Sequence, residues 1–174
     1  MIVTVGGQAA SGKSTLAKSL ASRLGFKHLS AGQIMRDMAA ERGVSLLEFS
    51  KYAESHPEVD KEIDKRQKKA AKGDCVVDGR LSRHFLKPGL SFWLVAPADV
   101  RARRVLGRGE SYSGFESALS ELSARDGSER DRYLRFYGID LNDLSVYDVV
   151  LNTGRFGIEE MTDVALAAVN SLRD

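Results

Sequence analysis

The sequence predicts an α/β protein, with a doubly wound five-stranded parallel sheet covered by helices. Two observations support this prediction. Short apolar or β-branched segments alternate with segments of helical periodicity along all 174 residues, the order that places strands side by side in a parallel sheet. Hydrophobic residues make up 43% and charged residues 29% of the chain, which suits one globular domain. We therefore expect a single domain over residues 1–174.

The first expected elements are a strand over residues 2–5 and a helix over residues 13–23. Between them, Gly7-x4-Gly12-Lys13-Ser14 matches the phosphate-loop (P-loop) pattern G-x-x-x-x-G-K-[ST]. The glycines let backbone N–H groups and the helix N-terminus face one anion. The lysine reaches the β- and γ-phosphates, and the serine hydroxyl suits Mg²⁺. We predict a nucleoside triphosphate site made of Gly7, Gln8, Ala9, Ala10, Ser11, Gly12, Lys13, Ser14 and Thr15.

The remaining elements follow from the same two periodicities. Strands are expected at residues 26–29, 74–78, 90–95 and 147–152, and helices from Ser30, over 46–53, over 57–71, from Pro97, over 115–137 and over 158–172. Three glycines and two serines at 107–114 indicate a flexible loop. The region 44–72 has few large apolar residues, so we expect it to move as a unit over a site.

Composition argues against several classes of protein. No apolar run approaches the roughly 18 residues that span a bilayer, and a formal charge of +2 gives no argument for nucleic acid. The single Cys75 cannot form an internal disulfide, and the three scattered histidines make no metal cluster. We expect a monomeric cytoplasmic protein with neither a membrane nor a nucleic-acid partner.

Arginine is the second chemical signal. Phosphoryl transfer between two bound phosphates is mainly positioning and charge stabilisation, so a second phosphate needs its own cations. The forked guanidinium suits that task. Asp78 and Arg80 follow a predicted strand at the edge where α/β sheets bind ligands, and no obvious Asp or His base is present, which favours an already ionised phosphate acceptor. The candidate arginines are Arg36, Arg80, Arg101, Arg104, Arg108, Arg125, Arg130 and Arg132.

Five segments together resemble the cytidylate kinases, and most closely their short archaeal members. They are Gly7-Gln-Ala-Ala-Ser-Gly-Lys-Ser-Thr, Ser30-Ala-Gly-Gln-Ile-Met-Arg, Val59-Asp-Lys-Glu-Ile-Asp, Val76-Val-Asp-Gly-Arg-Leu and the Arg125 to Arg132 segment. The resemblance runs in the same order from residue 2 to about residue 155. The chain lacks the longer insertion of bacterial members, and its loop departs from the Pro-Gly-x-Gly-Lys-Gly of adenylate kinases.

The resemblance implies a P-loop nucleoside monophosphate (NMP) kinase that uses ATP and Mg²⁺ and serves pyrimidine nucleotide metabolism. CMP and dCMP are the implied acceptors. The implied core comprises residues 1–43, 73–106 and 138–174, with an NMP-binding region at about 30–72 and a lid at about 107–132.

The resemblance also implies individual roles. Arg36, with Ser30 nearby, would bind the acceptor phosphate, and Asp60 and Arg80 would help to hold CMP. Asp78 is expected in the CMP site and near Mg²⁺, through water, with Ser14 as the direct ligand. Arg108 would lie against the ATP base, and backbone groups of the segment 152–154 would contact the edge of that base. Arg104 would flank the lid. Lys13, Arg125 and Arg132 would be the catalytic cations.

Structural interpretations stay open beside these roles. Arg36 could be a solvated helix residue, Asp78 a turn cap and Arg80 a loop residue. The i, i+4 spacings Glu121–Arg125 and Asp126–Arg130 suit an exposed helix held by ion pairs. The remaining candidates are expected to be structural: Arg101 and Arg103 at the surface, Phe92, Trp93 and Cys75 in the core, and Tyr133 with Tyr137 as a packing pair.

Two other functions also stay open. One is a kinase for another small acceptor such as AMP or UMP. The other is a regulatory or RNA-associated P-loop protein, which the near-neutral charge disfavours.

Overall fold

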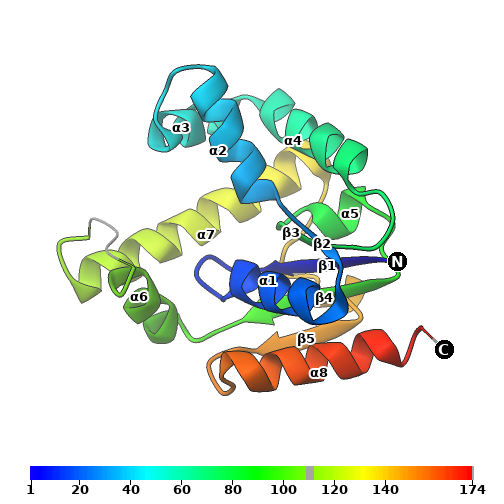
Figure 1. Cartoon of the computed structure of the whole chain (residues 1–174). Helices are drawn as coiled ribbons and strands as arrows, with labels where there is room; N and C mark the ends of the chain where they lie inside the picture. Colours follow the sequence, from blue (N-terminus) through cyan, green and yellow to red (C-terminus); the bar gives the residue numbers. More distant parts are fainter. Residues whose placement is uncertain (109–111, 174) are drawn as a thin grey trace.

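The computed structural model describes residues 1–108 and 112–173 and confirms a five-stranded, all-parallel sheet (Figure 1). The strand order is β2-β3-β1-β4-β5. The bounds are β1 Ile2–Gly7, β2 Lys27–Ser30, β3 Cys75–Asp78, β4 Leu90–Val95 and β5 Val149–Asn152. The inner strands β1, β3 and β4 are almost wholly buried, as their continuous apolar runs predict.

The register brings the candidate residues to one edge of the sheet. Val5 of β1 lies opposite Asp78 of β3 and Phe92 of β4. The P-loop therefore leaves β1 next to the segment that leaves β3. This is the crevice at the carboxyl ends of the strands where open α/β sheets bind ligands.

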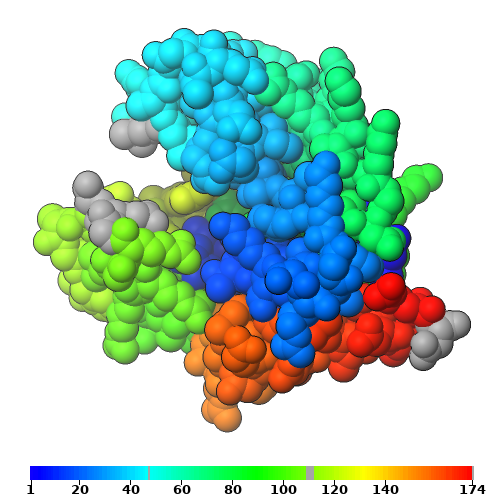
Figure 2. All heavy atoms as spheres, viewed as in Figure 1, coloured from blue at the N-terminus to red at the C-terminus, as the bar shows by residue number. Residues whose placement is uncertain are grey.

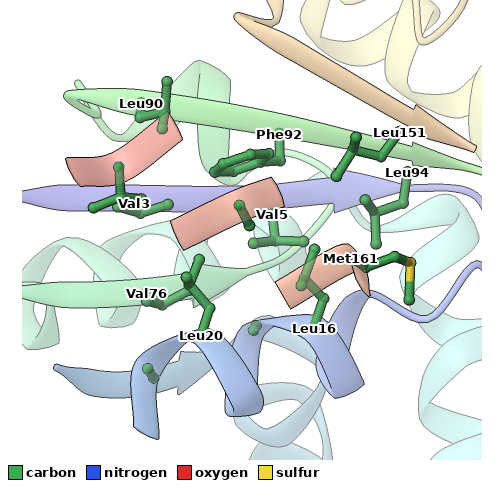
Figure 3. Close-up of a cluster of buried hydrophobic side chains, with 14 residues drawn as sticks. Val3, Val5, Leu16, Leu20, Val76, Leu90, Phe92, Leu94, Leu151 and Met161 are labelled. Atoms are coloured by element: carbon green, nitrogen blue, oxygen red, sulfur yellow. The ribbon is translucent and has the colours of Figure 1, made fainter. Parts of the chain in front are cut away.

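Helices cover both faces of the sheet. On one face, α1 Lys13–Leu24 and α8 Ile158–Asn170 pack against each other and the strands. Figure 3 shows Leu16 and Leu20 of α1 and Met161 of α8 meeting the side chains of Val3 and Val5. On the other face, Cys75 and Val77 pack against Leu86, which ends the short helix α5 Ser82–Phe85.

Three helices form a separate layer at one end of the sheet, at the top of Figure 1. They are α2 Ala31–Glu41, α3 Leu46–Ser55 and α4 Pro57–Ala70. They share a small core of Met38, Ala39, Phe49, Ala53, Val59 and Ile63. The predicted NMP-binding region thus has apolar packing of its own, distinct from the core of the sheet.

The predicted lid region lies on α6 Ala98–Leu106 and the long helix α7 Phe115–Tyr137. Apolar residues of both helices pack against Ala9 of the P-loop, and α7 then runs behind the sheet edge to α4 (Figure 1). Figure 2 shows a hollow between the α2–α3 layer and the α6 end of α7. Residues 109–111 of the expected flexible loop lie outside the described part of the chain.

Most element boundaries agree with the predicted ones within two residues. Helix α1 ends in a left-handed Gly25, and Phe26 N–H donates to Ala21 O at 2.9 Å. That helix-ending bond uses Phe26, so β2 begins at Lys27. A 3₁₀ turn, η1 Leu144–Val146, delays β5 to Val149. The sequence did not predict α5 or η1, which have one turn or less. Within the described residues, no helix is long and apolar enough to cross a membrane.

Candidate active site

The P-loop wraps around an open cradle between β1 and α1. Gly7 has φ +145°, and a Cβ there would lie 2.5 Å from Leu94 O, so only glycine fits. Gly12, at φ 93°, caps α1, and the non-glycine residue Ala10 has φ 57°. The loop is closed by Gln8 N–H to Leu94 O at 3.2 Å and Ser11 N–H to Gln8 O at 3.2 Å.

Lys13 stands in the first turn of α1 among other charged groups. Its Nζ donates to Gln8 O at 2.6 Å. Burial, together with the positive charges of Arg80 and Arg125, holds the pKa of Lys13 well below its ordinary value, while Asp78 and Asp126 oppose that shift. Arg80, just after β3, donates to Gly7 O of the same loop at 3.3 Å and shares Glu129 with Arg125 of α7. These contacts bring an arginine from the end of β3 and an arginine of α7 beside the P-loop.

Two arginines of α6 donate hydrogen bonds to backbone carbonyls of the P-loop. Arg101 Nη1 donates to Ala9 O at 3.2 Å and to Asp126 Oδ2 at 2.6 Å. Arg104 donates to Ala10 O at 3.4 Å and to Thr153 O at 2.6 Å. The surface position predicted for Arg101 is wrong, because the residue is only 6% exposed. Arg101 is buried because Ala9 O and the Asp126 carboxylate of α7 accept its hydrogen bonds. Spacing in the sequence does not indicate either partner.

A cavity of about 270 Å³ lies beside Gly12 and Thr15 of the loop. Arg104 and Arg108 from the α6 end line it, as do Phe156 and Met161 of the C-terminal segment. The role implied for Arg108 at the ATP base stays a prediction. Sequence reasoning missed Phe156, a 46% exposed aromatic residue. The only sequence signal was its position just after the strand-end segment 152–154.

The carboxyl end of β3 carries an unsatisfied acid. Asp78 is 3% exposed, and neither of its side-chain oxygens has a hydrogen-bond partner among the described residues. Nε2 of His28, on β2, lies 3.8 Å from Asp78 Oδ1. A turn-capping role is therefore not seen for Asp78. A buried carboxylate without partners is costly, and the charge of this one opposes the lowering of the pKa of Lys13.

Arg80, two residues further on, is also largely buried, with 10% of its side chain exposed. Its Nε donates to Gly7 O at 3.3 Å, and its guanidinium forms ion pairs with Glu129 and, at 3.9 Å, with Asp126. It is not a solvated loop residue. Gly79 allows this turn, because a Cβ there would collide with the Ser82 hydroxyl and lie 2.8 Å from Ala31 Cβ.

Arg36 and Ser30 lie on the other side of the hollow. Ser30 caps α2 by accepting from Gln33 N–H at 3.3 Å. Arg36 is exposed and donates to Gln33 Oε1 at 3.0 and 3.2 Å. Its guanidinium therefore makes local hydrogen bonds to an amide and forms no ion pair with an acid in the described chain.

Two acids of α7, Asp126 and Glu129, turn inward, and the ion pairs Glu121–Arg125 and Asp126–Arg130 that the spacing allows do not form among the described residues. Glu129 instead pairs with Arg125, at 3.0 Å, and with Arg80. Asp126 pairs with Arg101. A surface i, i+4 pair gains only a few tenths of a kcal/mol, whereas a buried guanidinium requires a partner.

Arg125 and Arg132 differ in their surroundings. The Arg125 side chain is 61% exposed, whereas that of Arg132 is 10% exposed. Arg132 Nε lies 3.7 Å from Asp60 Oδ2 of α4, and Nη2 donates to the Tyr133 hydroxyl at 2.9 Å. Tyr133 and Tyr137 do form the predicted packing pair, with ring centroids 6.3 Å apart. Sequence reasoning missed the contact of Tyr137 with α4.

The comparisons with known proteins agree with this geometry. A model of the "Cytidylate kinase-like family" matches residues 2–155. That match covers most of the chain. The chain belongs to the cytidylate kinase-like family.

Curated relatives are similar over almost their whole length. The chain is 47% identical to the cytidylate kinase of Pyrococcus horikoshii, with 99% of this chain and 90% of the relative aligned. It is 41% identical to the cytidylate kinase of Methanocaldococcus jannaschii, with 99% of each chain aligned. The predicted resemblance to short archaeal cytidylate kinases is therefore confirmed.

Solved structures support the fold alone, since their identities are low. A shikimate kinase from Bacteroides thetaiotaomicron superposes with a TM-score of 0.69 at 13% identity, with 98% of both chains covered. An uncharacterized protein from Eubacterium ventriosum gives a TM-score of 0.74 at 18% identity, with 98% of this chain and 99% of that chain covered.

Proposed function

We propose that this protein transfers the γ-phosphoryl group of ATP to CMP and dCMP, producing the diphosphates. One observation carries the proposal: Arg80 donates to Gly7 O of a complete phosphate cradle at 3.3 Å and shares Glu129 with Arg125 of α7. Two phosphates brought together need this convergence of cations. The curated relatives bear the name cytidylate kinase, and this name supplies the acceptor.

On the donor side, the backbone of residues 7–15 holds the ATP phosphates, and Lys13 exchanges Gln8 O for the β- and γ-oxygens. The bond to Gln8 O at 2.6 Å is the contact that this exchange breaks. Arg108 and Phe156 line the cavity beside the loop, which receives the ATP base between them. Among the described residues, the charged side chains that line the cavity are Arg104 and Arg108, and a guanidinium and the Phe156 ring can both stack on a base.

On the acceptor side, Arg36 and Arg80 bind the CMP phosphate, with Ser30 and Asp78 around it. Arg80 is buried and already oriented by Gly7 O and Glu129. Arg36 is exposed and rotates away from Gln33 to reach the phosphate. Asp60 closes the site from α4 through its contact with Arg132.

Residues at the loop fit Mg²⁺. The Ser14 hydroxyl is exposed at the start of α1, and Asp78 has two buried oxygens without partners among the described residues. No group of three or more His, Cys, Asp or Glu residues in the described chain could hold a metal ion by itself. Ser14 would bind the ion directly and Asp78 through water, with ATP phosphates as further ligands. Bound Mg²⁺ neutralises charge on the transferring phosphate.

The transfer itself is a single in-line displacement. An acceptor phosphate oxygen forms a bond to the γ-phosphorus as the bond to the bridging oxygen of ADP breaks. The acceptor is already ionised, so no base is needed. Lys13, Arg125 and Arg132 stabilise the charge that spreads over the γ-oxygens. Closure of the lid, residues 107–132, excludes water and so limits ATP hydrolysis.

A panel of acceptors tests the proposal. The purified chain with Mg²⁺ and ATP is assayed for ADP release with CMP, dCMP, UMP, AMP and shikimate. We expect the highest kcat/KM with CMP or dCMP. If AMP or UMP gives the highest rate, the acceptor is that nucleotide and not CMP. If RNA stimulates ATP hydrolysis and CMP does not, the protein is an RNA-associated nucleotide-binding protein and not a CMP kinase.

A further inference from the structure

The last turn of α7 is fixed to the first turn of α4 by a tyrosine hydroxyl. Tyr137 Oη donates to Pro57 O at 2.8 Å and lies 3.3 Å from Asp60 Oδ2. Its ring packs edge to face on Phe85 of α5, at 5.9 Å between centroids. The hydroxyl therefore bridges the lid helix and the NMP-binding layer, which are separated by about 77 residues in sequence.

Asp60 is the acid that this tyrosine fixes, and it is 7% exposed. Burial raises the pKa of Asp60, while Arg132 and the Tyr137 hydrogen bond oppose that rise. An ionised carboxylate in this position is desolvated, so it needs both partners. Its ion-pair partner is Arg132, whose Nε lies 3.7 Å from Asp60 Oδ2.

Arg132 has two partners, Asp60 and Tyr133, and still has N–H donors that no hydrogen bond uses among the described residues. Nη2 donates to the Tyr133 hydroxyl, while Nε is buried and has no hydrogen-bond partner among the described residues. A guanidinium has five N–H donors. The side chain is thus nine-tenths buried, oriented by Asp60 and Tyr133, and has donors left for an anion.

We propose that Tyr137 and Asp60 are positioning residues that aim Arg132 at the transferred phosphoryl group. This inference rests on the proposed function. Tyr137 fixes the carboxylate of Asp60, and the carboxylate fixes the guanidinium. Because Pro57 and Asp60 belong to α4, a movement of the NMP-binding layer on acceptor binding is passed to a lid arginine.

The first test is Tyr137→Phe, which keeps the ring packing and removes the hydroxyl. We expect kcat with CMP to fall about tenfold, the loss expected when a hydrogen bond to a charged group is removed. The KM for ATP should not change, because the donor cavity is distant from α4. Tyr147→Phe is the matched control, since its buried hydroxyl has no partner among the described residues. We expect wild-type kinetics for that variant.

A double-mutant cycle separates positioning from mere stability. If Tyr137 acts through Asp60, Tyr137→Phe lowers kcat in the wild-type background but not in an Asp60→Asn background. Independent, multiplying losses would overturn the inference, as would an unchanged kcat in Tyr137→Phe. Urea midpoints of all four proteins show whether a loss of kcat follows a loss of folding. A wild-type protein without CMP kinase activity would instead defeat the proposed function, and with it this inference.

Discussion

The proposed donor and acceptor sides of this site are built in different ways. The donor side is made mostly of backbone from nine consecutive residues, shaped by Gly7 and Gly12. The acceptor side is made of side chains from β2, α2, α4, β3 and α7. Contiguous backbone can form its geometry locally, whereas the acceptor side exists only when five elements have packed.

The two sides also differ in how their cations are paired. Lys13 bonds to a carbonyl of its own loop, so phosphate displaces a neutral acceptor. Arg80 and Arg132 have carboxylate partners, Glu129 and Asp60. These two cations are therefore oriented before the substrate arrives, whereas the exposed Arg36 bonds only to the Gln33 amide. The difference predicts that substitutions on the donor side lower kcat directly. Substitutions on the acceptor side should change the affinity for CMP and the orientation of the arginines.

The largest expected effect is on the donor side. Lys13→Ala removes the charge nearest the transferring group, so we expect kcat to fall by about 10³-fold or more, as when a preorganised transition-state donor is lost. Lys18→Ala, on the exposed face of the same helix, is the control and should keep its rate. A Lys13→Ala variant within tenfold of wild type would show that the loop is not the donor site.

The next effect is on stability. Arg101→Met leaves Asp126 partly buried without its 2.6 Å partner, so we expect the free energy of unfolding to drop by about 3 kcal/mol. Urea unfolding measures the loss. Arg103→Met, at a 71% exposed side chain of the same helix, should change stability by less than about 0.5 kcal/mol. Equal effects of the two variants would mean that the contacts of Arg101 with Ala9 O and Asp126 do not stabilise the P-loop.

A smaller effect separates the two sides kinetically. Arg36→Ala removes an exposed cation of the acceptor side, so we expect the KM for CMP to rise about tenfold with kcat and the KM for ATP nearly unchanged. Lys51→Ala, an exposed charge on α3, controls for the overall charge of this layer. An unchanged KM for CMP in Arg36→Ala would remove Arg36 from the acceptor site.

The smallest effect concerns the helix that joins the two sides. Gly127 lies inside α7, and a Cβ there would meet nothing within 4 Å. Gly127→Ala should therefore raise the free energy of unfolding by about 0.5–1 kcal/mol. Gly138→Ala, at the left-handed end of the same helix with φ 65°, should lower it. A more stable Gly127→Ala protein with a lower kcat would indicate that α7 bends at this point during turnover.

The sheet and the P-loop follow from local patterns in the sequence. Both are encoded by neighbouring residues: apolar runs at strand spacing, and a P-loop pattern in which each glycine has a local conformational task. The position of Asp78 at the carboxyl edge of the sheet also follows, since parallel strands end at one edge.

Only the tertiary structure decided which charges pair. Spacing along α7 allows the pairs Glu121–Arg125 and Asp126–Arg130, but Asp126 turns inward to Arg101, and Arg125 pairs with Glu129, which also reaches Arg80. Local helical pairs gain a few tenths of a kcal/mol, while a guanidinium without a partner in the interior costs several. The buried Arg80 and Arg101 therefore pair with acids of α7. Tyr137 lies close to Asp60 because that carboxylate is also buried and requires partners. Burial is a property of the packed chain, so no local pattern can specify these partners.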